Sequence, residues 1–128
     1  NAGWRGAYKG IIHKVIKFMF NKGCQRKNMI VGIGPCISVK NYEIKNNLKN
    51  KFIKQNRKNI QFFINKKDKI YFDLPNYVKN QVKQNQIKNI NLIDIDTFNE
   101  KNNFFSARRS LKNNHNDYGR NISIIVIN

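Results

Sequence analysis

The spacing of apolar residues predicts helices in three segments. Apolar side chains recur every three or four residues from Tyr8 to Phe20, and Asn21-Lys22-Gly23 supplies a stop signal. A second helix is predicted from Asn41 to about Gln55. A third is predicted after Asp73, because this side chain can cap a helix and Pro75 is tolerated in a first helical turn.

Short apolar runs between these helices predict strands, and polar residues between the runs predict turns. Residues 65–68 are polar enough for a turn, and Ser110–Asp117 reads as a polar loop. Strands that alternate with helices indicate an α/β or α+β domain, with a mixed sheet layered with helices. The predicted strands are Met29–Pro35, Ile60–Ile64, Lys69–Leu74, Ile90–Asp96, Asn103–Ala107 and Ile122–Ile127.

Length and composition fit a globular domain. The 128 residues are enough for one domain or for part of a larger one, and 40% of them are hydrophobic. Apolar runs stay far below the roughly 18 residues that span a bilayer, so no membrane association is predicted. Two separated cysteines, Cys24 and Cys36, do not make a disulfide framework. We therefore expect a cytoplasmic protein.

The net charge of +18 invites comparison with nucleic-acid-binding proteins. However, the excess is nearly all lysine, scattered along the chain and accompanied by much Asn and Ile. All three residue types have A/T-rich codons, so the base composition of the gene accounts for the bias. A solvated basic surface is the favoured interpretation, and nucleic acid is not the favoured partner.

The arginines are more informative than the lysines, because only six of the 25 basic residues are arginine. A planar guanidinium suits bidentate recognition of phosphate or carboxylate. Arg108 and Arg109 would point to opposite faces of an extended segment, so that one can enter a cleft, and Arg120 can return to the same cleft after the polar loop. Surface salt bridges are the competing interpretation, with nearly equal weight.

The opening residues predict a loop that binds an anion. Gly3 and Gly6 flank Trp4 and Arg5, and a helix is expected directly afterwards. Free N–H groups at a helix start favour an anion, and Arg5 can add a guanidinium donor. Trp4 would anchor the loop or form one wall of a pocket.

Other titratable residues give weaker signals. His13 and His115 lack a partner at metal-ligand spacing. Cys36 follows a turn after a buried strand, where a packed thiol is favoured over a nucleophile, and Cys24 is expected to be a small filler.

Asp94 and Asp96 can be read as paired carboxylates. The favoured alternative is that both alternate outward along a strand, which would leave Ile93 and Ile95 inward.

Several motifs together resemble the C-terminal half of the laccase-domain family. They are AGWRG before an amphipathic helix, GIGPCI, YFDL before a helix, and FFSARR followed by YGR and a final apolar strand, in this order. The family is also called multicopper polyphenol oxidase and peptidoglycan editing factor. The resemblance implies an architecture like the catalytic domain of cytotoxic necrotizing factor, of which residues 1–128 would form the C-terminal part.

The resemblance also implies an activity. The family includes zinc-dependent purine nucleoside enzymes that phosphorolyse adenosine, inosine and methylthioadenosine and deaminate adenosine. Older descriptions give copper and polyphenol oxidation. Purine nucleoside and phosphate are thus the implied partners. By motif position, the implied catalytic residues are Arg5, Arg108, Arg109 and Arg120, and the implied substrate-binding residues are Gly3, Trp4, Gly34, Phe105 and Ser106.

The first residue departs from the family pattern. The family motif is HAGWRG, whose His is one of three zinc ligands, two His and one Cys, but this chain has Asn1 there. An amide oxygen is a poor zinc donor, so we expect this chain to bind zinc weakly or not at all. The chain does not begin with Met, and we expect it to be part of a longer protein. The alternatives are a metal-free, non-catalytic remnant and a basic nucleic-acid-binding module.

Overall fold

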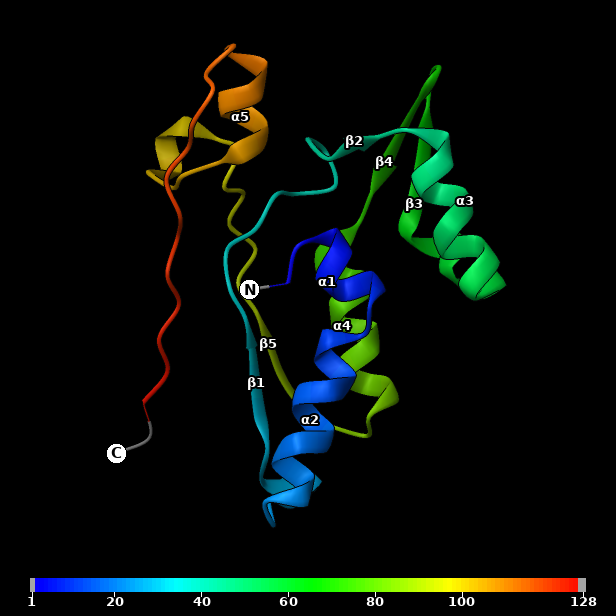
Figure 1. Cartoon of the computed structure of the whole chain (residues 1–128), viewed down its shortest axis with the longest axis vertical. Coiled ribbons are helices and arrows are strands. Elements are labelled where there is room, and N and C mark those ends of the chain that lie inside the picture. Colours follow the sequence, from blue (N-terminus) through cyan, green and yellow to red (C-terminus); the bar gives the residue numbers. More distant parts are fainter. Residues whose placement is uncertain (1, 127–128) are drawn as a thin grey trace.

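Two small sheets organise the chain (Figure 1), and the computed structural model describes residues 2–126. Strands β1 (Ile30–Ile33) and β5 (Asn89–Leu92) pair in parallel. Strands β2 (Glu43–Ile44), β4 (Lys69–Phe72) and β3 (Phe63–Lys66) form an antiparallel sheet in the order β2-β4-β3. Together with the helices they confirm the predicted mixed α/β class.

Five α-helices accompany these sheets in the described residues, and α2 and α4 pack against each other beside the parallel pair. None of them has the length and apolar character needed to cross a membrane. The α-helices are α1 (Trp4–Tyr8), α2 (Ile11–Asn21), α3 (Asn46–Gln55), α4 (Leu74–Gln84) and α5 (Ala107–Lys112), and short 3₁₀ helices cover Arg26–Asn28, Arg57–Phe62 and Glu100–Asn102.

An aromatic cluster forms the larger core, between α1, α3, α4 and the antiparallel sheet. Phe52 and Phe72 are fully buried at its centre, with ring centroids 4.9 Å apart. Tyr77 of α4 meets Phe52 edge-on at 5.0 Å, a favourable arrangement for aromatic rings. A smaller core of Ile16, Met29, Val82 and Ile87 joins α2 and α4 to the parallel pair.

The helices with the strongest apolar periodicity lie close to their predicted positions. The predicted stop of α2 is confirmed at Gly23, whose φ of +89° favours glycine. At its other end Gly10, with φ +72°, separates α2 from α1. Asp73 caps α4 as predicted, accepting a hydrogen bond of 3.1 Å from the Asn76 N–H.

Two predicted elements differ from those in the structure. In the first, pairing with a neighbouring strand replaces the start of a helix. In the second, side-chain hydrogen bonds to the backbone favour a 3₁₀ helix over a strand. The helix predicted from Asn41 begins only at Asn46, since residues 43–44 pair with β4 as β2. The strand predicted at Ile60–Ile64 is largely a 3₁₀ helix. Asn56 caps this helix through a 2.9 Å bond from the Lys58 N–H, and buried Asn59 donates to the Phe52 carbonyl.

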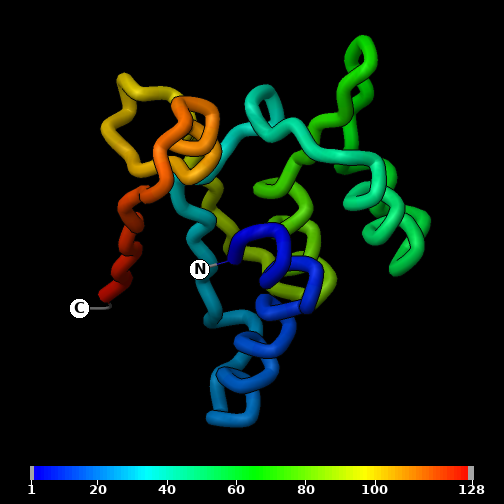
Figure 2. The backbone as a smooth tube through the Cα atoms, turned by 45° about the horizontal axis from the view of Figure 1, so that its top comes forward, coloured from blue at the N-terminus to red at the C-terminus, as the bar shows by residue number. Residues whose placement is uncertain are grey.

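The C-terminal region differs most from its prediction. Residues 103–107 are not a strand, because Ser106 caps α5, which also takes up part of the predicted polar loop. Residues 122–126 follow one side of the molecule without joining either sheet (Figures 1 and 2), and residue 127 lies outside the described part. Ile122 is 84% exposed, so the apolar pattern of this segment lacks a partner strand in residues 2–126.

Candidate functional site

Residues from three separate parts of the chain line one hollow of about 520 Å³, here called the cationic hollow. Its walls come from α1, β2, the first six residues of α3, and α5. Four of its side chains are cations and one is a carboxylate. The lining residues are Trp4, Arg5, Tyr42, Glu43, Ile44, Lys45, Asn47, Leu48, Lys51 and Arg108.

Helix α5 directs its two arginines to different places. Arg108 enters the cationic hollow, where its Nη1 donates to the Glu43 carbonyl at 2.6 Å and its guanidinium lies 5.3 Å from the centre of the Tyr42 ring. Arg109, about 100° further around the helix, donates to the carbonyls of Thr97, Phe98 and Phe104 at 2.6–3.0 Å. The two side chains diverge as predicted, but from a helix instead of a strand.

The opening motif is also helical, which corrects the predicted loop. Gly3 is the extended N-cap of α1 and is exposed, and Gly6 lies inside the helix. The guanidinium of Arg5 lies 5.3 Å from the centre of the Trp4 ring, and both residues line the cationic hollow.

Two glutamines fix α1 in place. Gln81 Nε2 of α4 donates to the Ala7 carbonyl at 2.9 Å, and Gln55 Nε2 of α3 donates to the Tyr8 carbonyl at 3.2 Å. Ala7 itself is fully buried against the aromatic cluster. The hydrogen bonds at the end of α1 thus set where Trp4 and Arg5 stand.

The electrostatics of the cationic hollow favour an anion. Its carboxylate, Glu43, is already paired at 2.9 Å with Lys69 of β4. Among residues 2–126, neither of the two ion pairs involves a cation of the hollow. The N-cap Lys45 and the first turn of α3 line the hollow, so the positive end of this helix dipole lies beside it. Burial raises the pKa of Tyr42 despite the opposing charge of Arg108.

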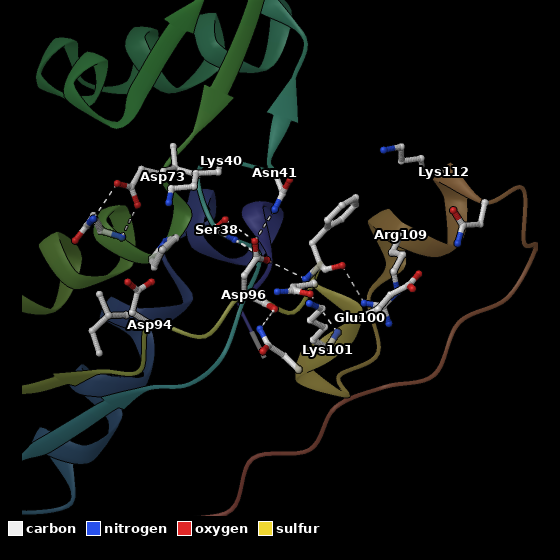
Figure 3. Close-up of a pocket in the computed structure, with 18 residues that line it drawn as sticks. Ser38, Lys40, Asn41, Asp73, Asp94, Asp96, Glu100, Lys101, Arg109 and Lys112 are labelled. Carbon is white, nitrogen blue, oxygen red and sulfur yellow. Dashed lines mark hydrogen bonds and ion pairs between the residues drawn. The ribbon is translucent and has the colours of Figure 1, made fainter.

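A second, larger hollow of about 1000 Å³ lies beyond the carboxyl ends of β1 and β5 (Figure 3). Its charges are mixed and partly paired with one another. Arg109 Nε, for example, lies 3.8 Å from Glu100 Oε1. The charged residues that line it are Lys40, Asp73, Asp94, Asp96, Glu100, Lys101, Arg109 and Lys112.

Asp96 holds two segments together in this second hollow. Its carboxylate accepts hydrogen bonds from the Ser38 hydroxyl, from Asn41 Nδ2 at 2.7 Å and from the Phe98 N–H at 2.8 Å (Figure 3). The predicted outward position of Asp96 is therefore wrong. Ile93 and Ile95, predicted inward, are 48% and 40% exposed, because β5 ends at Leu92 and the regular alternation stops there.

We expect Asp96 to make the protein lose stability in acid. Partial burial raises the pKa of Asp96, but the hydrogen bonds from Ser38, Asn41 and Phe98 outweigh it and hold the pKa below the usual 3.8. This stabilisation is present above the unfolded-state pKa and is lost as the pH falls through the folded-state value. Urea unfolding from about pH 5 to about pH 3 should therefore show a smaller loss for Asp96→Asn than for the wild type.

The matched control is Asp68→Asn, which changes an exposed carboxylate in the turn between β3 and β4. It should keep the wild-type pH dependence. Equal pH dependence in the wild type and in Asp96→Asn would contradict this role of Asp96.

Other predicted site residues lie away from the cationic hollow. Arg120 Nη1 donates to the Tyr118 carbonyl at 2.6 Å, and its guanidinium covers the Tyr118 ring at 4.4 Å. Phe105 is 58% exposed. Ser106 is the buried cap of α5. Gly34 follows β1, where an added Cβ would lie 3.6 Å from Ser123 Oγ.

The C-terminal segment is attached beside Phe105. Asn121 accepts from the Phe105 N–H at 3.0 Å and donates to its carbonyl at 2.8 Å. A Cβ at Gly119 would come within 2.5 Å of the Phe105 ring, so only glycine fits there without displacing the ring. In this structure Phe105 therefore holds the C-terminal segment.

Of the ten residues that line the cationic hollow, the amino-acid sequence alone identifies Trp4, Arg5 and Arg108. The seven others, among them Tyr42, Lys45 and Lys51, are not predicted. The two lysines carry no signal in a chain with lysine throughout. The apolar pattern puts Tyr42 on the inner side of a helix, whereas it precedes β2 and is buried beneath Arg108.

The described residues do not fit the metal site that the resemblance implies. Residues 2–126 bring no three His, Cys, Asp or Glu side chains together, and Asn1 lies outside the described part. Burial, with Asp96, Asp73 and Asp94 nearby, raises the pKa of Cys36 to about 11. This thiol is protonated at neutral pH and is a poor ligand or nucleophile.

Comparison with known proteins places these features in a family. The sequence profile described as "multi-copper polyphenol oxidoreductase laccase" matches residues 1–128. Two proteins named purine nucleoside phosphorylase, from Rickettsia prowazekii and Rickettsia conorii, are each 35% identical over 112 residues. The match covers 86% of this chain but 46% of each relative, so the chain spans about half the length of the curated relatives it matches.

Proposed function

Because this chain belongs to the multi-copper polyphenol oxidoreductase laccase family, we propose that it is part of a purine nucleoside phosphorylase. The carrying observation is that Arg5 of α1 and Arg108 of α5 line one hollow, although the chain places them far apart. Two guanidinium groups with few internal partners suit the charge and the planar geometry of phosphate. The name of the two rickettsial relatives supports the same activity.

In phosphorolysis, a phosphate oxygen attacks C1′ of the sugar while the bond from C1′ to the purine nitrogen breaks. The base leaves with the electron pair of that bond and takes up a proton. Arg5 and Arg108 hold the phosphate and orient it for this attack, and the positive end of α3 adds to the field. Trp4 offers the purine an aromatic surface at the edge of the same hollow.

The proposed substrates are adenosine, inosine and methylthioadenosine, with adenosine deamination as an accompanying activity. These details come from the family resemblance. The zinc that the resemblance implies would need side-chain ligands from outside residues 2–126. The proposed roles of Arg5, Arg108 and Trp4 therefore do not depend on a metal. For the remaining predicted site residues, only their positions in the family motifs support the proposed roles. These residues are Arg109, Arg120, Gly3, Gly34, Phe105 and Ser106.

We propose that these 128 residues are the C-terminal part of a single laccase-like domain. The length of the relatives and the exposed Ile122, Ile124 and Ile125 support this, because the missing part can supply a partner surface. A Cys and a His codon upstream of Asn1 in the gene would support both the longer domain and two of the zinc ligands. An upstream stop codon would contradict the longer domain.

The direct test of the proposed function is adenosine phosphorolysis by the full-length protein. We expect adenine and a sugar phosphate to form only when phosphate is present. A protein that folds but turns over none of the three nucleosides would instead be the metal-free remnant. Salt-sensitive binding of nucleic acid without turnover would indicate the basic binding module.

A further inference from the structure

The cationic hollow holds more positive charge than one phosphate needs. Orthophosphate near pH 7 is a mixture of the monoanion and the dianion, whose charge Arg5 and Arg108 can balance. Lys45 and Lys51 add two further cations to the same walls. The excess points to a ligand with more negative charge than orthophosphate.

The hollow does not neutralise these lysines itself. Glu43 is paired with Lys69, on the neighbouring strand. Lys49, the lysine of α3 two positions before Lys51, is bound elsewhere and donates to Asn65 Oδ1 at 3.3 Å. Lys51, in contrast, faces the hollow together with Lys45.

An aromatic wall stands beside the cations. Trp4 is half-buried and lines the hollow with Arg5 and Arg108. Stacking of a base on an aromatic side chain contributes to nucleotide binding with little dependence on sequence. The volume of about 520 Å³ falls within the range of small-molecule sites, about 300–1000 Å³, and has room for a base and more than one phosphate.

We propose that the cationic hollow binds a purine nucleoside diphosphate, which competes there with phosphate and so regulates the enzyme. The regulatory part of this inference rests on the proposed function, whereas the binding of the nucleoside diphosphate does not. Lys45 and Lys51 bind the additional phosphate, and Trp4 contacts the base. Free pyrophosphate shares the diphosphate chemistry, so the base distinguishes the two ligands.

Isothermal titration of the full-length protein with adenosine diphosphate tests the proposal without requiring turnover. We expect binding about tenfold tighter than that of pyrophosphate or of adenosine, and weaker when phosphate is added. The double variant Lys45→Gln/Lys51→Gln should weaken binding of adenosine diphosphate about tenfold. Lys14→Gln/Lys17→Gln, the same change in charge on exposed positions of α2, should leave it unchanged.

Three results of the binding experiments would overturn the inference. They are equal affinity for pyrophosphate and adenosine diphosphate, equal losses in the two double variants, and displacement of adenosine diphosphate by a lower concentration of a single-stranded RNA oligonucleotide. If adenosine diphosphate does not inhibit phosphorolysis, the inference is contradicted and the proposed function is not affected. Tight, phosphate-sensitive binding without phosphorolysis would contradict the proposed function and the regulation, and would leave the binding of the nucleoside diphosphate standing.

Discussion

Replacing Arg108 with Ala is expected to lower kcat/KM for phosphate about 100-fold in the proposed phosphorolysis of adenosine by the full-length protein. Arg108 reaches the cationic hollow from α5 and is held there by the Glu43 carbonyl and the Tyr42 ring. Its remaining guanidinium donors can therefore meet phosphate without much reordering. A loss of this size corresponds to about 2.8 kcal/mol, which is typical when a charged hydrogen-bond donor is removed from a reacting group. Steady-state kinetics with varied phosphate measures it.

How the loss of activity divides between phosphate and adenosine is as informative as its size. We expect most of the loss to appear with phosphate and little in the KM for adenosine, because we propose that Arg108 binds phosphate. Arg26→Ala is the matched control, since this exposed arginine lies after α2, where it covers the Phe20 ring at 4.5 Å. It should stay within about twofold of the wild type. An unchanged kcat/KM for phosphate in Arg108→Ala would refute the proposed role of this residue.

The parts of the fold that the sequence predicts best are those whose signals are local. The apolar stripe of α2, its glycine stop and the Asp73 cap of α4 all act within a few residues, and each is found near its predicted position. The family resemblance, carried by ordered motifs, is confirmed by the profile match over the whole chain.

Strand predictions are less successful because a strand depends on a partner that its own sequence does not specify. Residues 43–44 find such a partner in β4 and leave the predicted helix. Residues 122–126 have the apolar pattern of a strand but pair with neither sheet in the described part. At residues 103–107, a single serine cap is sufficient to begin α5 in place of a strand.

The candidate site is predictable only in part, for a related reason. Arginine stands out against the lysine background, so the amino-acid sequence alone identifies Arg5 and Arg108 as candidates. It does not tell which arginine shares a hollow with which, because this depends on the rotation of α5. That helix sends Arg108 to the cationic hollow and Arg109 to three backbone carbonyls.

Phe52→Ala is expected to be strongly destabilising, by about 3–5 kcal/mol. Phe52 is fully buried, and its ring centroid lies 4.9–5.8 Å from those of Tyr8, Phe63, Phe72 and Tyr77. Truncation removes the packing of α3 against α1, α4 and the antiparallel sheet at once, and the surrounding rings are too large to close the cavity. Domains of this kind have about 5–15 kcal/mol of stability, so a large share would be lost.

Urea unfolding of the protein measures this loss, and a second variant keeps the test decisive if Phe52→Ala does not fold. Phe52→Leu should still unfold cooperatively, with a loss of about 1–2 kcal/mol, because it retains most of the buried volume. Phe18→Ala removes the same ring from a position of α2 that is 63% exposed, and it should change stability by no more than about 0.5 kcal/mol. A loss in Phe52→Ala as small as that in Phe18→Ala would mean that the aromatic cluster does not hold α1, and hence Arg5, in place.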